Sequence, residues 1–272
     1  MNEPLSESAS PTVPQAASLP ETSVPLVLAV VPAHNEAGRV GTVVQGLAAQ
    51  RLPVLVVDDG STDGTAEEAR AAGAVVLSLS PNRGKGEALK AGFRAALAGA
   101  ERDSVDPGLG GPWAAILTLD GDGQHDPAEV PRLLEAWRKT RADLVVGFRD
   151  YRQMPPVRRF TNTVSRLLFS WAIGRWVPDN QSGFRLRSKR LAEAALASPE
   201  KGFAFEVEEI AICAGRGYRV AWVPVGAIYG SERSDIRPWS HFVSFLTVTF
   251  RARRRMRAER CVGGRGGRIG LP

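Results

Sequence analysis

The sequence has only two cysteines, contains no apolar run of spanning length and shows no internal repeat. Cys213 and Cys261 lie far apart and match no metal-ligand spacing, which favours reduced thiols in a cytoplasmic protein. A membrane-spanning helix needs roughly 20 apolar residues, so we expect that the chain by itself does not cross a bilayer. The N-terminus also lacks the basic and apolar pattern of a secretory signal peptide. These absences predict a cytoplasmic location.

The composition is that of an ordinary globular protein, with 43% apolar and 24% charged residues. The formal net charge of +6 and the pI near 9.8 predict an acidic partner. Nucleic acid, an anionic membrane surface and a phosphorylated substrate all satisfy that description. Charge alone does not choose among them, so the choice depends on the motifs.

Three segments differ in composition. Residues 1–23 are rich in Pro, Ser, Glu, Thr and Ala and poor in large apolar side chains, so they are expected to be disordered. Residues 24–238 carry the regular apolar patterns of one domain. Residues 239–272 are first amphipathic and then strongly basic, which predicts a C-terminal segment and tail outside that domain.

Apolar runs alternate with helical patterns along the domain. Strands are predicted at Val24 to Ala33, Pro53 to Val57, Ala74 to Leu79, Trp113 to Leu119 and Asp143 to Phe148. The intervening segments place apolar residues at helical spacing. Because parallel strands need crossover helices, this alternation predicts an α/β fold with a mostly parallel central sheet and helices on both faces.

Polar clusters follow the predicted strands. Residues 32–36, 58–63, 82–86 and 120–124 each come after the C-terminal end of a strand. In open α/β sheets, ligands bind beyond these ends of the strands. The sequence therefore predicts that four polar turns meet at one edge of the sheet.

The segment Leu117 to Pro127, LTLDGDGQHDP, delivers two carboxylates at that edge. Asp120 and Asp122 lie one residue apart after an apolar strand, and Gln124 adds a neutral oxygen donor. Oxygen ligands of this kind suit Mg²⁺ or Mn²⁺, and the adjoining glycines leave room for a phosphate-bearing ligand. A cation held there would neutralise charge on a departing diphosphate. The alternative is a purely structural pair of surface carboxylates.

An ordered series of motifs resembles a known family. The series is PAHNE at 32–36, VDDGSTDGT at 57–65, NRGKGEAL at 82–89, LDGDGQHDP at 119–127 and QSGFRL at 181–186. It resembles the family-two inverting glycosyltransferases of GT-A fold, and among them the dolichyl- or polyprenyl-phosphate hexosyltransferases. The resemblance covers roughly Val24 to Pro238, and a collinear series is far more specific than a single motif.

The resemblance implies a divalent cation and a nucleotide-diphosphate sugar donor of the GDP-mannose or UDP-glucose type. It implies a donor pocket lined by Pro32, His34, Glu36, Asp58, Asp59, Lys85 and Asp120, with Asp122 at the reacting end. The family often carries Tyr or Phe where His34 stands. Without the resemblance, Asp59 to Asp63 would be read as a tight turn and Lys85 as a surface charge.

The prediction of the acceptor-binding site depends on fewer residues. Arg149 and Arg185 match positions where relatives carry basic residues near the sugar diphosphate or the lipid phosphate. A planar guanidinium suits phosphate oxygens, although either arginine could instead pair with a carboxylate. Asp179, Ser182 and Gly183 match the acceptor loop of the family, and their alternative interpretation is an ordinary turn.

The acceptor decides whether a general base is needed. A polyprenyl phosphate is already an anion, whereas a hydroxyl acceptor must lose a proton to a carboxylate. Glu206, Glu208 and Glu209 are the available cluster. Glutamates on a helix more often form its solvated side, which is the interpretation expected here.

Two further segments combine apolar faces with arginines. Residues 157–176 and 242–255 could contact an anionic membrane surface, or could be core helices with solvated arginines. Transfer to a soluble or glycan hydroxyl is a second enzymatic hypothesis. A nucleic-acid-binding module driven by the Arg-rich tail is a third, but it leaves the acidic edge unexplained. The motifs favour hexosyl transfer to a polyprenyl phosphate, with peripheral membrane contact.

Overall fold

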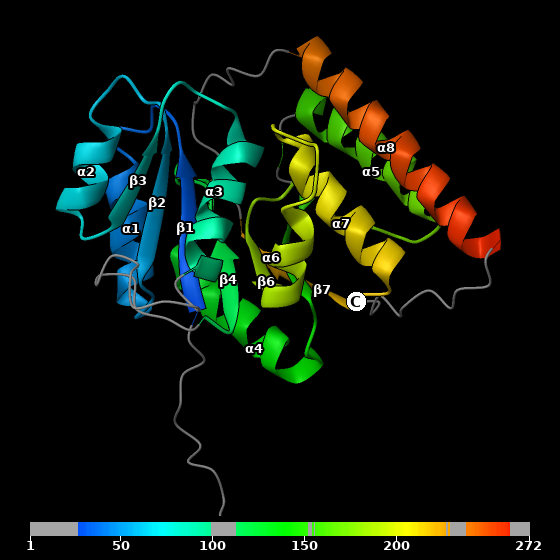
Figure 1. Ribbon diagram of the computed structural model, residues 1–272, viewed down its shortest axis with the longest axis horizontal. Coiled ribbons are helices and arrows are strands. Elements are labelled where there is room, and N and C mark those ends of the chain that lie inside the picture. The colour runs from blue at the N-terminus through cyan, green and yellow to red at the C-terminus, as the bar shows by residue number, and fades with distance from the viewer. Residues whose placement is uncertain are drawn as a thin grey trace, which may run out of the picture.

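The computed structural model describes residues 27–98, 113–151, 154, 156–226, 228 and 238–261 (Figure 1). The N-terminal segment predicted to be disordered, residues 1–23, lies outside the described residues. The part of the basic tail that follows Cys261 also lies outside them.

One seven-stranded sheet organises the chain, in the order β3-β2-β1-β4-β6-β5-β7. The strands are β1 (Val27–Ala33), β2 (Val54–Asp59), β3 (Val75–Leu79), β4 (Ala115–Thr118), β5 (Leu144–Arg149), β6 (Arg185–Ser188) and β7 (Val220–Val225). Every residue of β1, β2 and β4 is buried, as expected of parallel strands covered on both faces. The prediction of a mostly parallel sheet is confirmed.

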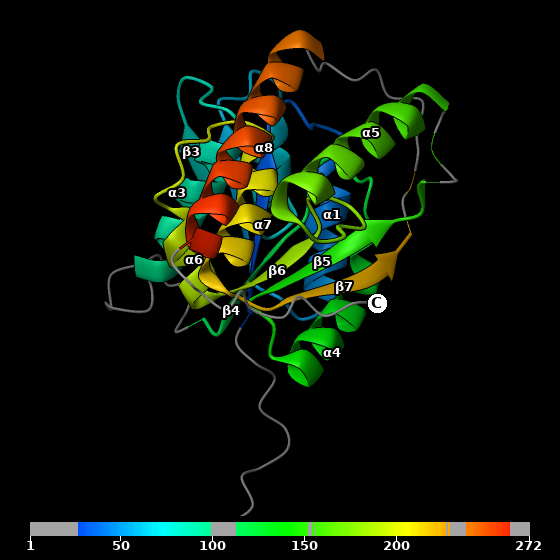
Figure 2. The same ribbon diagram turned by 90° about the vertical axis from the view of Figure 1, so that its right-hand side faces the viewer.

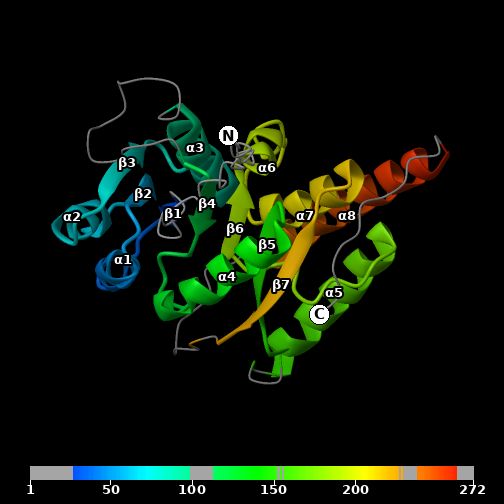
Figure 3. The same cartoon turned by 90° about the horizontal axis from the view of Figure 1, so that it is seen from below.

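Helices cover both faces of the sheet, also as predicted (Figures 1 and 3). They are α1 (Val40–Ala49), α2 (Thr65–Ala71), α3 (Lys85–Ala98), the 3-10 turn η1 (Pro127–Glu129), α4 (Val130–Thr140), α5 (Pro156–Ile173), α6 (Lys189–Ala195), α7 (Ala204–Arg216) and α8 (Pro238–Cys261). Side chains of α1, α2 and α4 form one apolar cluster with the sheet, and side chains of α3, α5, α6, α7 and α8 form the other.

Strand β6 is the departure from a parallel sheet. It runs antiparallel to both neighbours, and Arg185 pairs with Thr118 of β4 and Val146 of β5. An antiparallel strand begins at the edge where its parallel neighbours end. Residues 179–184, which precede β6, therefore lie beside the turn that follows β4.

Helix α8 packs against α7 and α5 (Figure 2). Its side chains Phe245, Val248 and Ala252 are buried in the same cluster as the sheet. The first part of the C-terminal segment thus contributes to the core. Over the described ranges, none of the helices combines the length and the apolar character required to traverse a lipid bilayer.

Candidate active site

The turns after β1 and β2 are joined by hydrogen bonds. The backbone N–H of Asn35 donates to Ser61 Oγ at 2.9 Å, and the N–H of Glu36 donates to Thr65 Oγ1 at 2.8 Å. His34 is exposed, and Glu36 forms an ion pair with Arg39, the residue before α1. The predicted gathering of polar turns at one edge is therefore observed here.

The adjacent aspartates of β2 organise two different turns. Asp58 accepts a hydrogen bond from the Ser61 N–H at 3.0 Å, within its own turn. Asp59 accepts from the N–H groups of Arg83 and Gly84, at 2.8 and 2.7 Å. Both carboxylates are buried. Asp59 thereby fixes the segment that leads into α3 and sets the position of the next residue, Lys85.

The glycines around Lys85 serve close packing. A Cβ on Gly84 would lie 2.8 Å from the carbonyl oxygen of Lys201, and one on Gly86 would lie 2.7 Å from the carbonyl carbon of Lys201. Only glycine allows the start of α3 to approach the segment before α7 this closely. This approach brings the Lys85 side chain to Glu206, in the first turn of α7.

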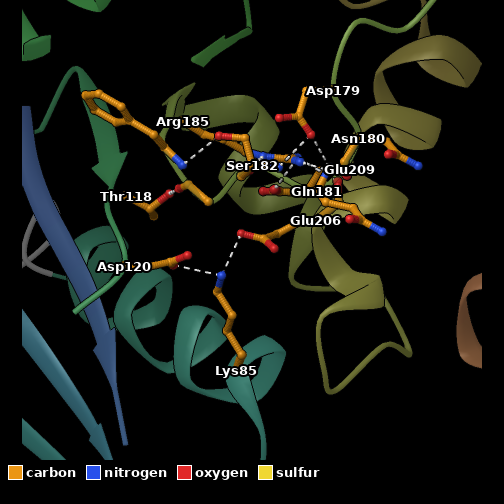
Figure 4. A network of polar contacts seen from close by, with 12 residues as sticks. Lys85, Thr118, Asp120, Asp179, Asn180, Gln181, Ser182, Arg185, Glu206 and Glu209 are labelled. Carbon is orange, nitrogen blue, oxygen red and sulfur yellow. Dashed lines mark hydrogen bonds and ion pairs between the residues drawn. The ribbon is translucent and has the colours of Figure 1, made fainter. Parts of the chain in front are cut away.

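Lys85 lies between two carboxylates (Figure 4). Its ammonium nitrogen is 2.7 Å from Asp120 Oδ1 and 3.1 Å from Glu206 Oε1. Burial would lower the pKa of Lys85, but the two carboxylates outweigh burial and raise it, so the ammonium stays charged. Burial raises the pKa of Glu206, whereas the Lys85 ammonium outweighs burial at Asp120 and lowers the pKa of that carboxyl. The site therefore favours the ionised form more strongly at Asp120 than at Glu206.

Asp120 lies directly against Gly183. A Cβ on Gly183 would lie 2.5 Å from both carboxylate oxygens, so any larger residue would displace the aspartate. The Thr118 hydroxyl donates to the Gly183 carbonyl at 2.7 Å and ties the loop to β4. The predicted acceptor loop and the predicted cation ligand are therefore in contact.

Asp122 is held by its own turn, because its Oδ1 accepts from the Gln124 N–H at 2.9 Å. Among the described residues, no group of three or more His, Cys, Asp or Glu side chains could hold a metal ion. A magnesium ion in a nucleotide site typically takes one or two carboxylates, with substrate phosphates and water as the other ligands. Asp120 and Asp122, in the turn that follows β4, supply that number of carboxylates.

Arg149, at the end of β5, is bound by Asp179. Its Nε donates to Asp179 at 2.8 Å, and a second nitrogen donates at 3.2 Å. The hydroxyl of Tyr151 and the N–H groups of Gln181 and Ser182 donate to the same carboxylate. Burial would raise the pKa of Asp179, but Arg149 and the backbone N–H of Gln181 lower it. Asp179 therefore fixes the loop and orients Arg149.

The expected contact of Arg185 with a phosphate does not fit the structure. Its side chain is fully buried, and its guanidinium donates to the carbonyl oxygens of Ser182, Asn180 and Glu206 and to the carboxylate of Glu209. These bonds occupy the guanidinium inside the protein. Arg185 is a positioning residue that holds the loop in front of β6.

The expectation that the three glutamates form a solvated helix side is wrong. Glu206, Glu208 and Glu209 are all buried. Glu206 faces Lys85, and Glu209 accepts hydrogen bonds from both Arg185 and Arg187. Helical spacing could not reveal this, because their partners lie on β6 and α3. The buried arginine at every second position of β6, in the sequence FRLR, was the available signal.

His125, which follows the two aspartates, was not predicted to be a site residue from the sequence. It is buried, and its ring packs on Phe184 with the ring centres 5.5 Å apart. Burial lowers its pKa to about 4, so it is neutral near pH 7. Its position directly after Gln124 in the same motif was the signal that could have identified it.

The fold and this edge define a glycosyltransferase. The chain matches the model of Glycosyl transferase family 2 over residues 28–196, and it belongs to that family. It is similar to the glucosyl-3-phosphoglycerate synthase of Mycobacterium tuberculosis in complex with Mn²⁺ and UDP-glucose, with a TM-score of 0.65 and 22% identity over 85% of this chain and 79% of that one. This likeness shows the fold.

Two relatives are named for lipid-linked substrates. The undecaprenyl-phosphate mannosyltransferase of Micrococcus luteus is 33% identical over 73% of this chain and 82% of its own length. The polyprenol monophosphomannose synthase of Mycolicibacterium smegmatis is 30% identical over 73% of this chain and 76% of its own length. The resemblance to polyprenyl-phosphate hexosyltransferases is therefore confirmed.

Replacing Gly183 with alanine is expected to lower the transfer rate by about 10², because an ångström-scale displacement at a reacting centre costs that much. The added methyl group overlaps both oxygens of Asp120. Gly202→Ala is the matched control, since a Cβ there meets nothing within 4 Å. Initial rates and thermal midpoints of both variants check the prediction. Equal rates in the two variants would contradict it.

Proposed function

We propose that this glycosyltransferase moves a hexose from a nucleotide-diphosphate sugar to a polyprenyl phosphate, with inversion and with a divalent cation. The observation that carries the proposal is the meeting of Asp120, Lys85 and the Gly183 loop at the edge where the parallel strands end. The relatives named for polyprenyl phosphates support the choice of acceptor.

Different residues at this edge would bind different parts of the donor. Asp120 and Asp122 would hold the cation, which supplies positive charge to the departing diphosphate when it is bound. Lys85 provides a permanent ammonium beside Asp120, where it can donate to phosphate oxygens. The turns that contain His34, Glu36 and Asp58 would face the nucleoside. The burial of Asp58 indicates that it supports its turn.

The acceptor side has one oriented arginine. Arg149 is fixed by Asp179 at the end of β5, beside the loop that contacts Asp120. A phosphate acceptor carries its own negative charge and attacks without a general base. Ser182 and Gly183 would set the distance between that acceptor and the donor. Gln124 remains our third proposed cation ligand.

The hydroxyl-acceptor alternative would require a base at the same place. Glu206 is the carboxylate best suited to this role, because its pKa is raised and it pairs with the Lys85 ammonium, which also pairs with Asp120. Glu206→Gln separates the alternatives. A phosphate acceptor predicts that transfer persists in this variant, whereas a hydroxyl acceptor predicts that it is lost.

Donor binding can be tested without any acceptor. A panel of UDP- and GDP-sugars with Mn²⁺ or Mg²⁺ is expected to contain one combination that raises the thermal midpoint, because a ligand of the folded state stabilises it by about 2.7 kcal/mol at 100 times Kd. The nucleoside diphosphate without the cation should stabilise less. A panel without any shift would contradict a nucleotide-sugar donor.

The acceptor is tested with a radiolabelled sugar donor. Label that partitions into organic solvent only when a polyprenyl phosphate is present supports the proposal. Label that stays in the aqueous phase on an added glycan supports the hydroxyl alternative.

A further inference from the structure

Three charged side chains meet where the turn after β4 faces the starts of α3 and α7 (Figure 4). The Lys85 ammonium lies 2.7 Å from Asp120 Oδ1 and 3.1 Å from Glu206 Oε1. The side chains of Lys85 and Glu206 are 12% and 2% exposed, so salt and water screen their charges little. Two carboxylates thus compete for a single ammonium.

Glu206 depends on Lys85 for its counter-charge. Apart from this ion pair, no donor in the described part of the chain forms a hydrogen bond with the buried Glu206 Oε1. The nearby Arg185 donates to the backbone carbonyl oxygen of Glu206 and to the carboxylate of Glu209. A buried carboxylate without a counter-charge is costly. The ammonium therefore has a second carboxylate to which it can withdraw from Asp120.

Asp120 is one of the proposed cation ligands, and the ammonium already contacts one of its oxygens. An ammonium and a divalent cation compete for the same carboxylate, because both are attracted by its charge and repel each other. Gly183 lies against both oxygens of Asp120, which leaves this carboxylate little freedom to turn away from Lys85. In the free protein the ammonium therefore opposes cation binding.

We infer that Lys85 is an internal counter-ion that makes cation binding depend on the nucleotide diphosphate. In the free protein its ammonium neutralises Asp120. When the diphosphate brings its own negative charge, the ammonium leaves Asp120 for Glu206 and the phosphate oxygens, and Asp120 becomes available to the cation. Glu206 is then a positioning residue that acts through Lys85. This role rests on the proposed function, because it requires a cation at Asp120.

The test measures Mn²⁺ binding to the full chain by electron paramagnetic resonance, without nucleotide and with UDP or GDP. Without nucleotide, Lys85→Met is expected to bind Mn²⁺ about tenfold more tightly than the wild type, since an opposite charge in contact lowers the affinity of a carboxylate for a proton by about that factor or more. With the nucleotide the gain should be smaller. The coupling between Mn²⁺ and the diphosphate, which is reciprocal, should therefore fall in this variant.

Glu206→Gln is expected to change the affinity in the opposite direction. The ammonium then has Asp120 as its remaining carboxylate in this cluster, so Mn²⁺ should bind more weakly than to the wild type, again by about tenfold. A general loosening of the site would instead weaken binding in both variants. The opposite signs therefore distinguish competition by Lys85 from a purely structural role.

The double variant Lys85→Met with Glu206→Gln shows whether Glu206 acts through Lys85. If it does, the glutamine has no further effect, and the double variant binds Mn²⁺ as tightly as Lys85→Met. The double variant also leaves no buried carboxylate of Glu206 without a counter-charge, so it replaces the single Lys85 variant if that protein does not fold. Lys201→Met and Glu87→Gln are the matched controls: they remove an exposed ammonium before α7 and a carboxylate of α3 that pairs with Lys90. Both should bind Mn²⁺ like the wild type.

Equal Mn²⁺ affinity of the wild type and the folded Lys85 variants without nucleotide would overturn the inference. So would weaker binding by both single variants. In either case, Mn²⁺ binding by the wild type with UDP or GDP would leave the proposed cation site in place. Absence of Mn²⁺ binding by the wild type with both nucleotides would refute that cation site, and the counter-ion role of Lys85 with it.

Discussion

Replacing Asp122 with asparagine is expected to lower the rate of sugar transfer by about 10² to 10³, the usual cost of removing one electrostatic contact made in the transition state. The substitution removes the negative charge and keeps the shape of the side chain. Its oxygen can still accept from the Gln124 N–H, so the turn should persist. Initial rates at saturating donor and thermal midpoints measure the two effects separately.

Asp126→Asn is the matched control for this variant. Asp126 lies in the same motif and caps η1 by accepting from the Ala128 N–H at 2.8 Å. Asparagine caps a helix as well as aspartate does, so neither rate nor stability should change much. Near-normal transfer by the Asp122 variant would remove the basis for placing the cation there.

The second large effect concerns stability. Glu209→Gln is expected to lower the free energy of unfolding by about 3–5 kcal/mol, the typical cost of breaking a buried ion pair from one side. Glu209 is fully buried and accepts from both Arg185 and Arg187. Without its charge, two buried guanidinium groups lose their anionic partner. Urea denaturation of the wild type and the variant measures the difference.

The control replaces a glutamate whose partner is in solvent. Glu135 pairs with Lys139 one turn later on α4, and both side chains are largely exposed. Exposed pairs contribute little to stability, so Glu135→Gln should unfold at nearly the same urea concentration as the wild type. A Glu209 variant as stable as this control would show that the buried network is not needed for folding.

The charged network around Lys85 and the buried network around Glu209 have different roles, although both contact the loop that precedes β6. Lys85, Asp120 and Glu206 meet where the parallel strands end. Arg185, Glu209 and Arg187 lie behind them, across β6 and α7. Because Arg185 also holds the carbonyl oxygens of Asn180 and Ser182, the second network supports the loop on which the first depends.

Much of the fold could be predicted because its signals are local. The apolar runs of β1, β2 and β4 and the capping pattern around Asp126 each lie within a few consecutive residues. The burial of the two arginines of β6 escaped prediction for the opposite reason. Both arginines donate to Glu209, and Arg187 also donates to Thr118, and these partners lie far away in the sequence.

The sequence by itself determined the alternation of strands and helices, the edge at which polar turns gather and the family to which the motifs belong. These properties depend on patterns within short stretches of chain. Only the tertiary structure decided that Arg185 and the three glutamates are buried, that Gly183 lies on Asp120 and that the apolar side of α5 faces outward. Burial and charge pairing depend on which segments meet in space, and the antiparallel placement of β6 sets that meeting.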